Sequence, residues 1–178
     1  MALINTTTTG VLGSTFFGDG TGPLNIQQNG VTLGIYGNIP TFAATRITSD
    51  QTGTGSAYVK VQFQSKVFDT ANCYDTTNYR FIPNVAGYYL FNATVLNNPS
   101  AGTQTQLVTK IYKNGTPVTA FANLVIGGGI GGGTSLTVTE IFYMNGTTDY
   151  AEVYQYSNAT TPTYQGNSYF TGFLFKAT

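Results

Sequence analysis

Charged residues are scarce in this chain of 178 residues: only 8% are Asp, Glu, Lys or Arg, and the net charge is zero. Soluble domains typically carry about 25% charged residues. The low charge argues against electrostatic attraction to nucleic acid or to an anionic membrane surface. Because a neutral surface also favours association, we expect partners or further copies of the chain to cover part of it.

Histidine and tryptophan are absent, and Cys73 is the only cysteine. Without histidine the chain has no Ser-His or Cys-His nucleophilic pair, and a zinc site would have to combine one cysteine with scattered carboxylates. A single cysteine also excludes an internal disulfide. We therefore expect no enzyme activity, no cofactor and no metal, and a structural or binding role instead.

Helical periodicity and long apolar runs are missing as well. No window of about ten residues combines the helical period with good helix formers. The N-terminus has neither the basic flank of a secretory signal nor a sustained apolar run, so we expect no export signal and no transmembrane segment. The chain is accordingly expected to be made and assembled in the cytoplasm of its host.

Aromatic residues and glycines are plentiful: 14% of the residues are Tyr or Phe, and there are 22 glycines. Together with many Thr and Val residues they favour short strands joined by turns. Gly87 to Val95, for example, places Tyr89, Phe91, Ala93 and Val95 on one face. The other segments expected as strands are 58–63, 106–112, 135–144, 149–156 and 168–176, with a tight hairpin turn at Asn114-Gly115 leading from 106–112 into Thr116-Pro117-Val118. This spacing predicts an all-β, antiparallel jelly-roll sandwich.

Seven residues, Gly127 to Gly133, contain six glycines and interrupt the series of strands. The run lacks the Lys-Ser/Thr ending and the following helix of a phosphate-binding loop. We therefore expect a flexible or closely packed loop without a phosphate ligand.

Residues 1–45 differ from the remainder, because their apolar residues come in short groups, each followed by a glycine. Such a segment cannot build a large core. It is expected to be an extended arm, with a small hairpin turning at Asn29-Gly30, that gains order by lying on another surface. Residues 46–178 form the expected head domain. The residues expected to anchor the arm are Val11, Leu12, Phe16, Phe17, Leu24 and Ile26.

A set of motifs occurs in the order seen in a known family: Tyr74-Asp75, Phe81-x-Pro83, Gly87-Tyr88-Tyr89-x-Phe91, Lys113-Asn114-Gly115, Asn145-Gly146 with Asp149, and Phe170-x-Gly172-Phe173-Leu174. In this set the chain resembles the globular head of complement C1q and its relatives, over about residues 58–176. The resemblance implies a fold like that of tumour necrosis factor and a tight homotrimer. It leaves calcium binding, known in some relatives, open, because the usual Gly-Asp is loosened to Gly146-Thr147-Thr148-Asp149.

Large side chains share one face of the strand that carries Tyr150, Glu152, Tyr154 and Tyr156. Tyrosine combines contact area with a polar tip, which suits a trimer interface or stacking against carbohydrate. We favour the trimer interface for Tyr150, Tyr154 and Tyr156.

The head joined to this arm shows a second resemblance, to small structural proteins of tailed bacteriophages, carried by Gly10–Gly13, Phe17–Gly22, Asn29–Val31 and Val67–Thr70. It implies a protein on the virion surface. The leading hypothesis is a trimeric capsid decoration (cement) protein whose arm binds the major capsid protein. The alternative is a tail fibre or receptor-binding tip, attached to a tail component, whose loops 97–103 and 158–167 recognise a host surface glycan. A soluble ligand like the cytokine relatives is less favoured, because no export signal is present.

Overall fold

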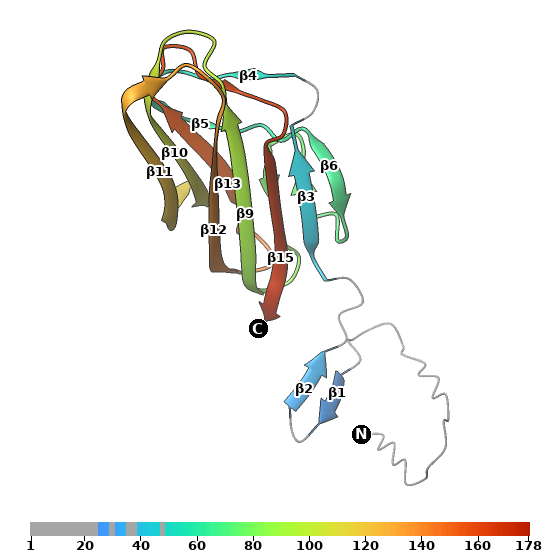
Figure 1. Cartoon of the computed structure of the whole chain (residues 1–178). Coiled ribbons are helices and arrows are strands. Elements are labelled where there is room, and N and C mark those ends of the chain that lie inside the picture. Colours follow the sequence, from blue (N-terminus) through green and yellow to red (C-terminus); the bar gives the residue numbers. More distant parts are fainter. Residues whose placement is uncertain (1–24, 29–30, 35–38, 47–48) are drawn as a thin grey trace, which may run out of the picture. The chain divides into compact units, whose positions relative to one another are not determined.

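The computed structural model describes residues 25–28, 31–34, 39–46 and 49–178 (Figure 1). All regular elements in these ranges are strands, which confirms the expected all-β class. No helix among the described residues is long and apolar enough to cross a membrane. The chain divides into two compact units, Met1–Gly37 and Asn38–Thr178, which are described separately.

In the N-terminal unit, β1 (Asn25–Gln28) pairs with β2 (Val31–Gly34) in an antiparallel hairpin. Asn25 lies opposite Gly34 and Gln28 opposite Val31, so the pairing confirms the hairpin that Asn29-Gly30 predicts. Of the expected anchoring residues, Ile26 lies in β1, opposite Leu33. The other five, Val11, Leu12, Phe16, Phe17 and Leu24, lie outside the described residues, so their role stays a prediction.

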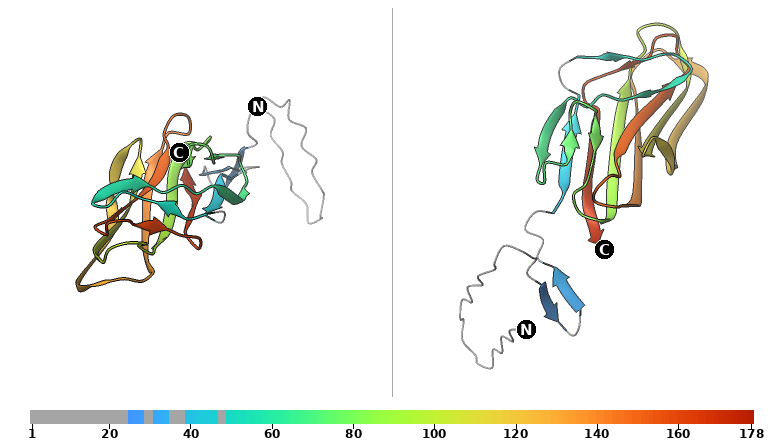
Figure 2. Two further views of the ribbon diagram at one scale, coloured as in Figure 1. Left: turned by 90° about the horizontal axis from the view of Figure 1, so that it is seen from above. Right: turned by 180° about the vertical axis from the view of Figure 1, so that it is seen from behind.

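The C-terminal unit contains a six-stranded and a seven-stranded antiparallel sheet. The six-stranded sheet has the order β11 (Thr116–Ile130), β10 (Gln104–Lys113), β13 (Ala151–Ser157), β8 (Arg80–Phe81) and β7 (Tyr74–Asp75), with β5 (Ala57–Lys60) also paired to β13. The seven-stranded sheet has the order β4 (Gln51–Thr52), β14 (Thr163–Tyr164), β9 (Gly87–Asn97), β15 (Tyr169–Ala177), β3 (Thr41–Thr45) and β6 (Ser65–Asp69), with β12 (Thr134–Met144) also paired to β9. Figure 2 shows the two sheets as the layers of a sandwich.

Side chains from both sheets fill the space between the layers, as the alternation along β9 predicts. Tyr89, Phe91, Ala93 and Val95 are all fully buried. The ring of Phe91 stacks on that of Phe142 with centroids 4.7 Å apart, and it lies against the rings of Phe81 and Phe170. A methyl group on Gly172 would come within 2.7 Å of Phe91, so this aromatic core needs glycine at that point.

Two expected boundaries differ from the structure. The C-terminal unit begins before residue 46, because β3 pairs with both β15 and β6 inside the seven-stranded sheet.

The expected loop over Gly127–Gly133 is wrong for its first half, because β11 continues to Ile130. Ile130 pairs with Gln104, and an irregularity in the register between Gln104 and Gln106 absorbs the extra residues. Pairing with β10 thus holds a glycine-rich segment in a strand despite its low propensity.

Candidate binding faces

The outer side of the seven-stranded sheet carries a continuous group of apolar side chains, which we call the apolar face. Its members come from β9, β12 and β15: Tyr88, Leu90, Ile141, Tyr143, Phe173 and Phe175. Phe173 and Ile141 flank Leu90 in register. Tyr143 lies opposite Tyr88, with ring centroids 5.7 Å apart. Between 41% and 62% of each side chain other than Leu90 is exposed.

The outer side of the six-stranded sheet combines aromatic rings with lysines, and we call its central part the tyrosine–lysine face. It consists of Tyr58, Lys60, Lys110, Phe121, Tyr154 and Tyr156. One row across four strands runs Phe121, Lys110, Tyr154 and Lys60, in register. In the next row Tyr156 lies between Tyr58 and the buried Val108, with the Tyr58 and Tyr156 ring centroids 5.4 Å apart.

Charges on this face are held by specific partners. Lys60 forms an ion pair with Glu152, whose side chain is buried, and the Tyr154 hydroxyl donates a 3.2 Å hydrogen bond to the same carboxylate. The Lys110 ammonium lies 4.9 Å from the centre of the Tyr58 ring and 5.3 Å from that of Phe121. Lys110 belongs to none of the four ion pairs formed by the described residues.

Two tyrosines of this region keep their protons at neutral pH. Burial raises the pKa of Tyr154 to about 12, and the negative charge of Glu152 adds to the rise. Burial also raises the pKa of Tyr112, whose ring centre lies 4.1 Å from that of Tyr154, although the Lys110 charge opposes the rise. Both hydroxyl groups therefore remain hydrogen-bond donors under physiological conditions.

The three tyrosines predicted for a trimer interface lie on or beside the tyrosine–lysine face. Tyr154 and Tyr156 are half-buried in β13, and Tyr150 directly precedes that strand. The Arg80 guanidinium lies over the Tyr150 ring at 4.8 Å. Alternation placed Tyr154 and Tyr156 together, but it gave no sign of Tyr58, Lys110 and Phe121, because these arrive from three other strands. The interface role of the three tyrosines stays a prediction.

Asp149 lies in the connection from β12 in one sheet to β13 in the other. Its carboxylate accepts hydrogen bonds from the Asn114 amide at 2.7 Å and the Asn145 N–H at 2.9 Å, and it pairs with Lys113 at 2.8 Å. Burial alone would raise the pKa of Asp149, but these donors together outweigh it and lower the pKa. The carboxylate thus has its charge partner inside the chain, and the described residues contain no group of three or more acidic, cysteine or histidine side chains able to hold a metal.

The two loops considered for glycan recognition are joined by backbone hydrogen bonds. Ser100 N–H donates to the Thr161 carbonyl at 3.0 Å, and Thr161 N–H donates to the Ala101 carbonyl at 3.1 Å. The second loop also contributes β14, which pairs with β4 and β9. These contacts restrain both loops at one end of the sandwich.

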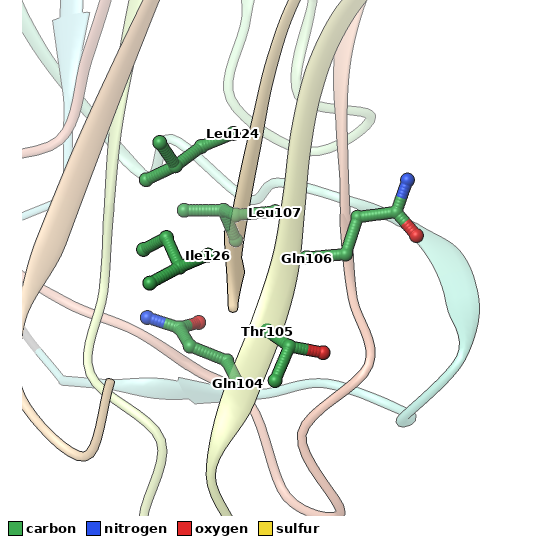
Figure 3. Close-up of a pocket in the computed structure, with 6 residues that line it drawn as sticks. All are labelled: Gln104, Thr105, Gln106, Leu107, Leu124 and Ile126. Carbon is green, nitrogen blue, oxygen red and sulfur yellow. The ribbon is translucent and has the colours of Figure 1, made fainter. Parts of the chain in front are cut away.

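The C-terminal unit has one narrow hollow and one wider hollow. One lies between β10 and β11 and is too narrow to admit a water molecule; Figure 3 shows Leu107, Leu124, Ile126 and the amide of Gln104 pointing to the same side. Ligand pockets usually have volumes of about 300–1,000 Å³. A second hollow, of about 370 Å³, reaches the lower end of this range and lies beside Cys73; burial raises the pKa of that thiol and so disfavours the reactive thiolate.

Comparison with known proteins agrees with this architecture. A family model of the C1q domain matches residues 41–175. The globular domain of the zebrafish complement 1qA protein is 17% identical, with a TM-score of 0.53, over 79% of this chain and 99% of that one. The Eiger TNF of S. frugiperda is 8% identical, with a TM-score of 0.58, over 79% and 95%. Murine APRIL is 13% identical, with a TM-score of 0.50, over 76% and 97%. A search of curated protein sequences finds no significant match.

These comparisons confirm the expected C1q-like and tumour necrosis factor-like jelly roll. At these low identities the structural likeness shows the fold alone. The resemblance to bacteriophage proteins and the expected position on a virion stay predictions.

Proposed function

We propose that this chain, which belongs to the C1q domain family, is a homotrimeric structural protein of a tailed-bacteriophage virion. In this proposal it is a capsid decoration protein on the virion surface. The C-terminal unit trimerises, and the N-terminal segment binds the major capsid protein.

The exposed apolar face is the main support for the proposed self-association of the chain. Five of its six side chains are at least 41% exposed, and none of the six carries a charge. Large contiguous apolar patches on soluble proteins mark interaction surfaces. Completely burying a large apolar side chain contributes about 1.5–3 kcal/mol, so covering this face with a second copy would stabilise an assembly substantially.

The tyrosine–lysine face is less suited to close packing between copies. Covering it would remove the Lys60 and Lys110 ammonium groups from water, which costs free energy unless the partner supplies matching charges. The centres of protein interfaces are depleted in charged residues, and aromatic residues are enriched there. We therefore assign trimerisation to the apolar face rather than to Tyr150, Tyr154 and Tyr156.

The virion assignment is supported by the sequence resemblance of the N-terminal segment to phage structural proteins. Trimerisation would present three such segments together. A second and third segment bind at a high effective concentration once the first is bound, so weak individual contacts add up. The apolar residues that we expect to make these contacts are Val11, Leu12, Phe16, Phe17, Leu24 and Ile26.

Deleting residues 1–37 tests the proposal, because residues 38–178 form a compact unit with their own core. The truncated protein should remain a trimer by light scattering and should lose binding to capsids, while the full chain binds. Substituting Phe16 and Phe17 by serine in the full chain should weaken capsid binding in the same direction. Undiminished capsid binding by the truncated trimer would contradict the decoration role.

The alternative is a tail fibre or receptor-binding tip that recognises a host surface glycan. The tyrosine–lysine face favours this candidate, because it combines exposed rings, hydroxyl donors and a cation. Labelling the chain in intact virions would separate the two roles, since decoration predicts label over the capsid and a fibre tip predicts label at the end of the tail.

A further inference from the structure

Lys110 is a cation without a counter-ion among the described residues, and it is held in a defined place. Its ammonium lies over the rings of Tyr58 and Phe121, which restrict a side chain that is otherwise flexible. Lys60 nearby is neutralised by Glu152. The centre of the tyrosine–lysine face therefore carries one net positive charge beside two rings that are 40% and 57% exposed.

We propose that the tyrosine–lysine face binds an anionic polysaccharide. The Lys110 ammonium pairs with a carboxylate or sulfate group of the sugar chain. The exposed parts of the Tyr58 and Phe121 rings pack against the C–H faces of neighbouring sugar units, and tyrosine hydroxyl groups bond to their rims.

The chemistry of a sugar unit matches this surface in three respects. A pyranose ring has an apolar C–H face that flat aromatic rings can cover, while tyrosine keeps a polar tip for hydroxyl groups. A carboxylate or sulfate group on the sugar supplies the counter-ion that Lys110 lacks among the described residues. The strands hold these residues on a regular sheet, with the buried Val108 beside Tyr156 on the neighbouring strand, so little ordering is required on binding.

This inference goes beyond the proposed assembly and depends on it in one respect: a trimer formed through the apolar face leaves the tyrosine–lysine faces uncovered. A long polymer can then contact more than one of them, and its contacts add up. An assembly formed through Tyr150, Tyr154 and Tyr156 would instead cover the site.

The test uses the full chain and three polymers: alginate, which carries carboxylates; dextran sulfate, which carries sulfates; and neutral dextran. Binding is measured by calorimetry at low ionic strength, where surface charges are least screened. We compare Lys110→Met, which keeps the apolar stem, with Lys176→Met as the matched control. Lys176 is exposed on β15, opposite Tyr88 at the edge of the apolar face, and like Lys110 it takes part in none of the four ion pairs of the described residues. Light scattering checks that Lys176→Met keeps the assembly of the wild type.

We expect at least one anionic polymer to bind and neutral dextran not to bind; the polymer that binds identifies the anionic group. Lys110→Met should weaken binding about tenfold, because a modest ionic contact is repeated in the trimer, and Lys176→Met should leave it unchanged. Phe121→Ser, at an exposed position, should weaken binding too. Thermal unfolding confirms that each variant is folded.

Failure to bind either anionic polymer, equal binding of neutral dextran, or unchanged binding by both Lys110→Met and Phe121→Ser would overturn the proposal. Light scattering on the same samples reports the assembly separately. A monomeric protein that binds alginate through Lys110 would contradict the proposed trimer and support the polysaccharide site.

Discussion

The outer faces of the two sheets follow the same alternation of inward and outward residues, but they present different chemistry. The apolar face exposes Phe, Ile and Tyr side chains, with one charge, Lys176, at its edge. The tyrosine–lysine face carries two lysines, and Lys110 lies over the rings of Tyr58 and Phe121. Both sheets share one aromatic core. The comparison shows that one architecture leaves the outward residues of each sheet free to differ. We propose another copy of the chain as the partner of the apolar face and an anionic polysaccharide as the partner of the tyrosine–lysine face.

Removing the core that both faces share should have the largest effect. Phe91 is fully buried and contacts five other rings of the core. Phe91→Ala should therefore lower the free energy of unfolding by about 3–5 kcal/mol, measured by urea unfolding. It should abolish both functions together, and unchanged stability would show that the core is packed differently.

A charge on the apolar face should break the assembly while preserving the fold. Phe173→Glu places an unpaired carboxylate among Leu90 and Ile141, so it should weaken self-association by about 2 kcal/mol or more and yield monomers in light scattering. The matched control is Phe121→Glu, at a comparably exposed position on the other sheet, which should remain a trimer. The reverse pattern would assign the interface to the tyrosine–lysine face.

The connection between the two sheets should respond to acid. Because hydrogen bonds and Lys113 lower the pKa of Asp149 in the folded chain, its carboxylate stabilises the fold above the unfolded value of about 3.9, and this contribution is lost as the pH falls through the lower folded value. Asp149→Asn should cost about 1.5 kcal/mol at neutral pH. Urea unfolding at pH 7 and pH 3 should show a smaller difference from the wild type at pH 3; equal differences at both pH values would contradict this role.

The smallest effect concerns the protonation of the tyrosine–lysine face. Because the pKa of Tyr154 is raised to about 12, its neutral form stabilises the fold below the ordinary pKa of about 10, and this contribution is lost as the pH rises through about 12. In an ultraviolet titration, Tyr154→Phe should remove one ionisation near pH 12. Loss of an ionisation near pH 10 would mean that Tyr154 is neither buried nor paired with Glu152.

Much of the fold was predictable, because the alternation of inward and outward side chains along a strand depends only on residues close together in the sequence. Tyr89, Phe91, Ala93 and Val95 are inward as expected, and Tyr154 and Tyr156 share the outward side of β13. The turn at Asn114-Gly115 into β11 was predicted, but the continuation of β11 to Ile130 was missed, because Ala120, Ala122 and the glycines that follow have weak strand propensity. Pairing with β10 supplies the backbone hydrogen bonds that the local sequence does not predict.

The amino-acid sequence by itself determined the all-β class, the aromatic core, and the lack of histidine that excludes His-dependent catalysis, because these depend on composition and on neighbours two residues apart. Only the tertiary structure decided that Tyr58, Lys110 and Phe121 meet on one surface, and that Leu90, Ile141 and Phe173 form another. Each group is assembled across strands that are distant in the chain. Their register follows from packing and hydrogen bonding of the whole sandwich, and no local pattern of residues specifies it.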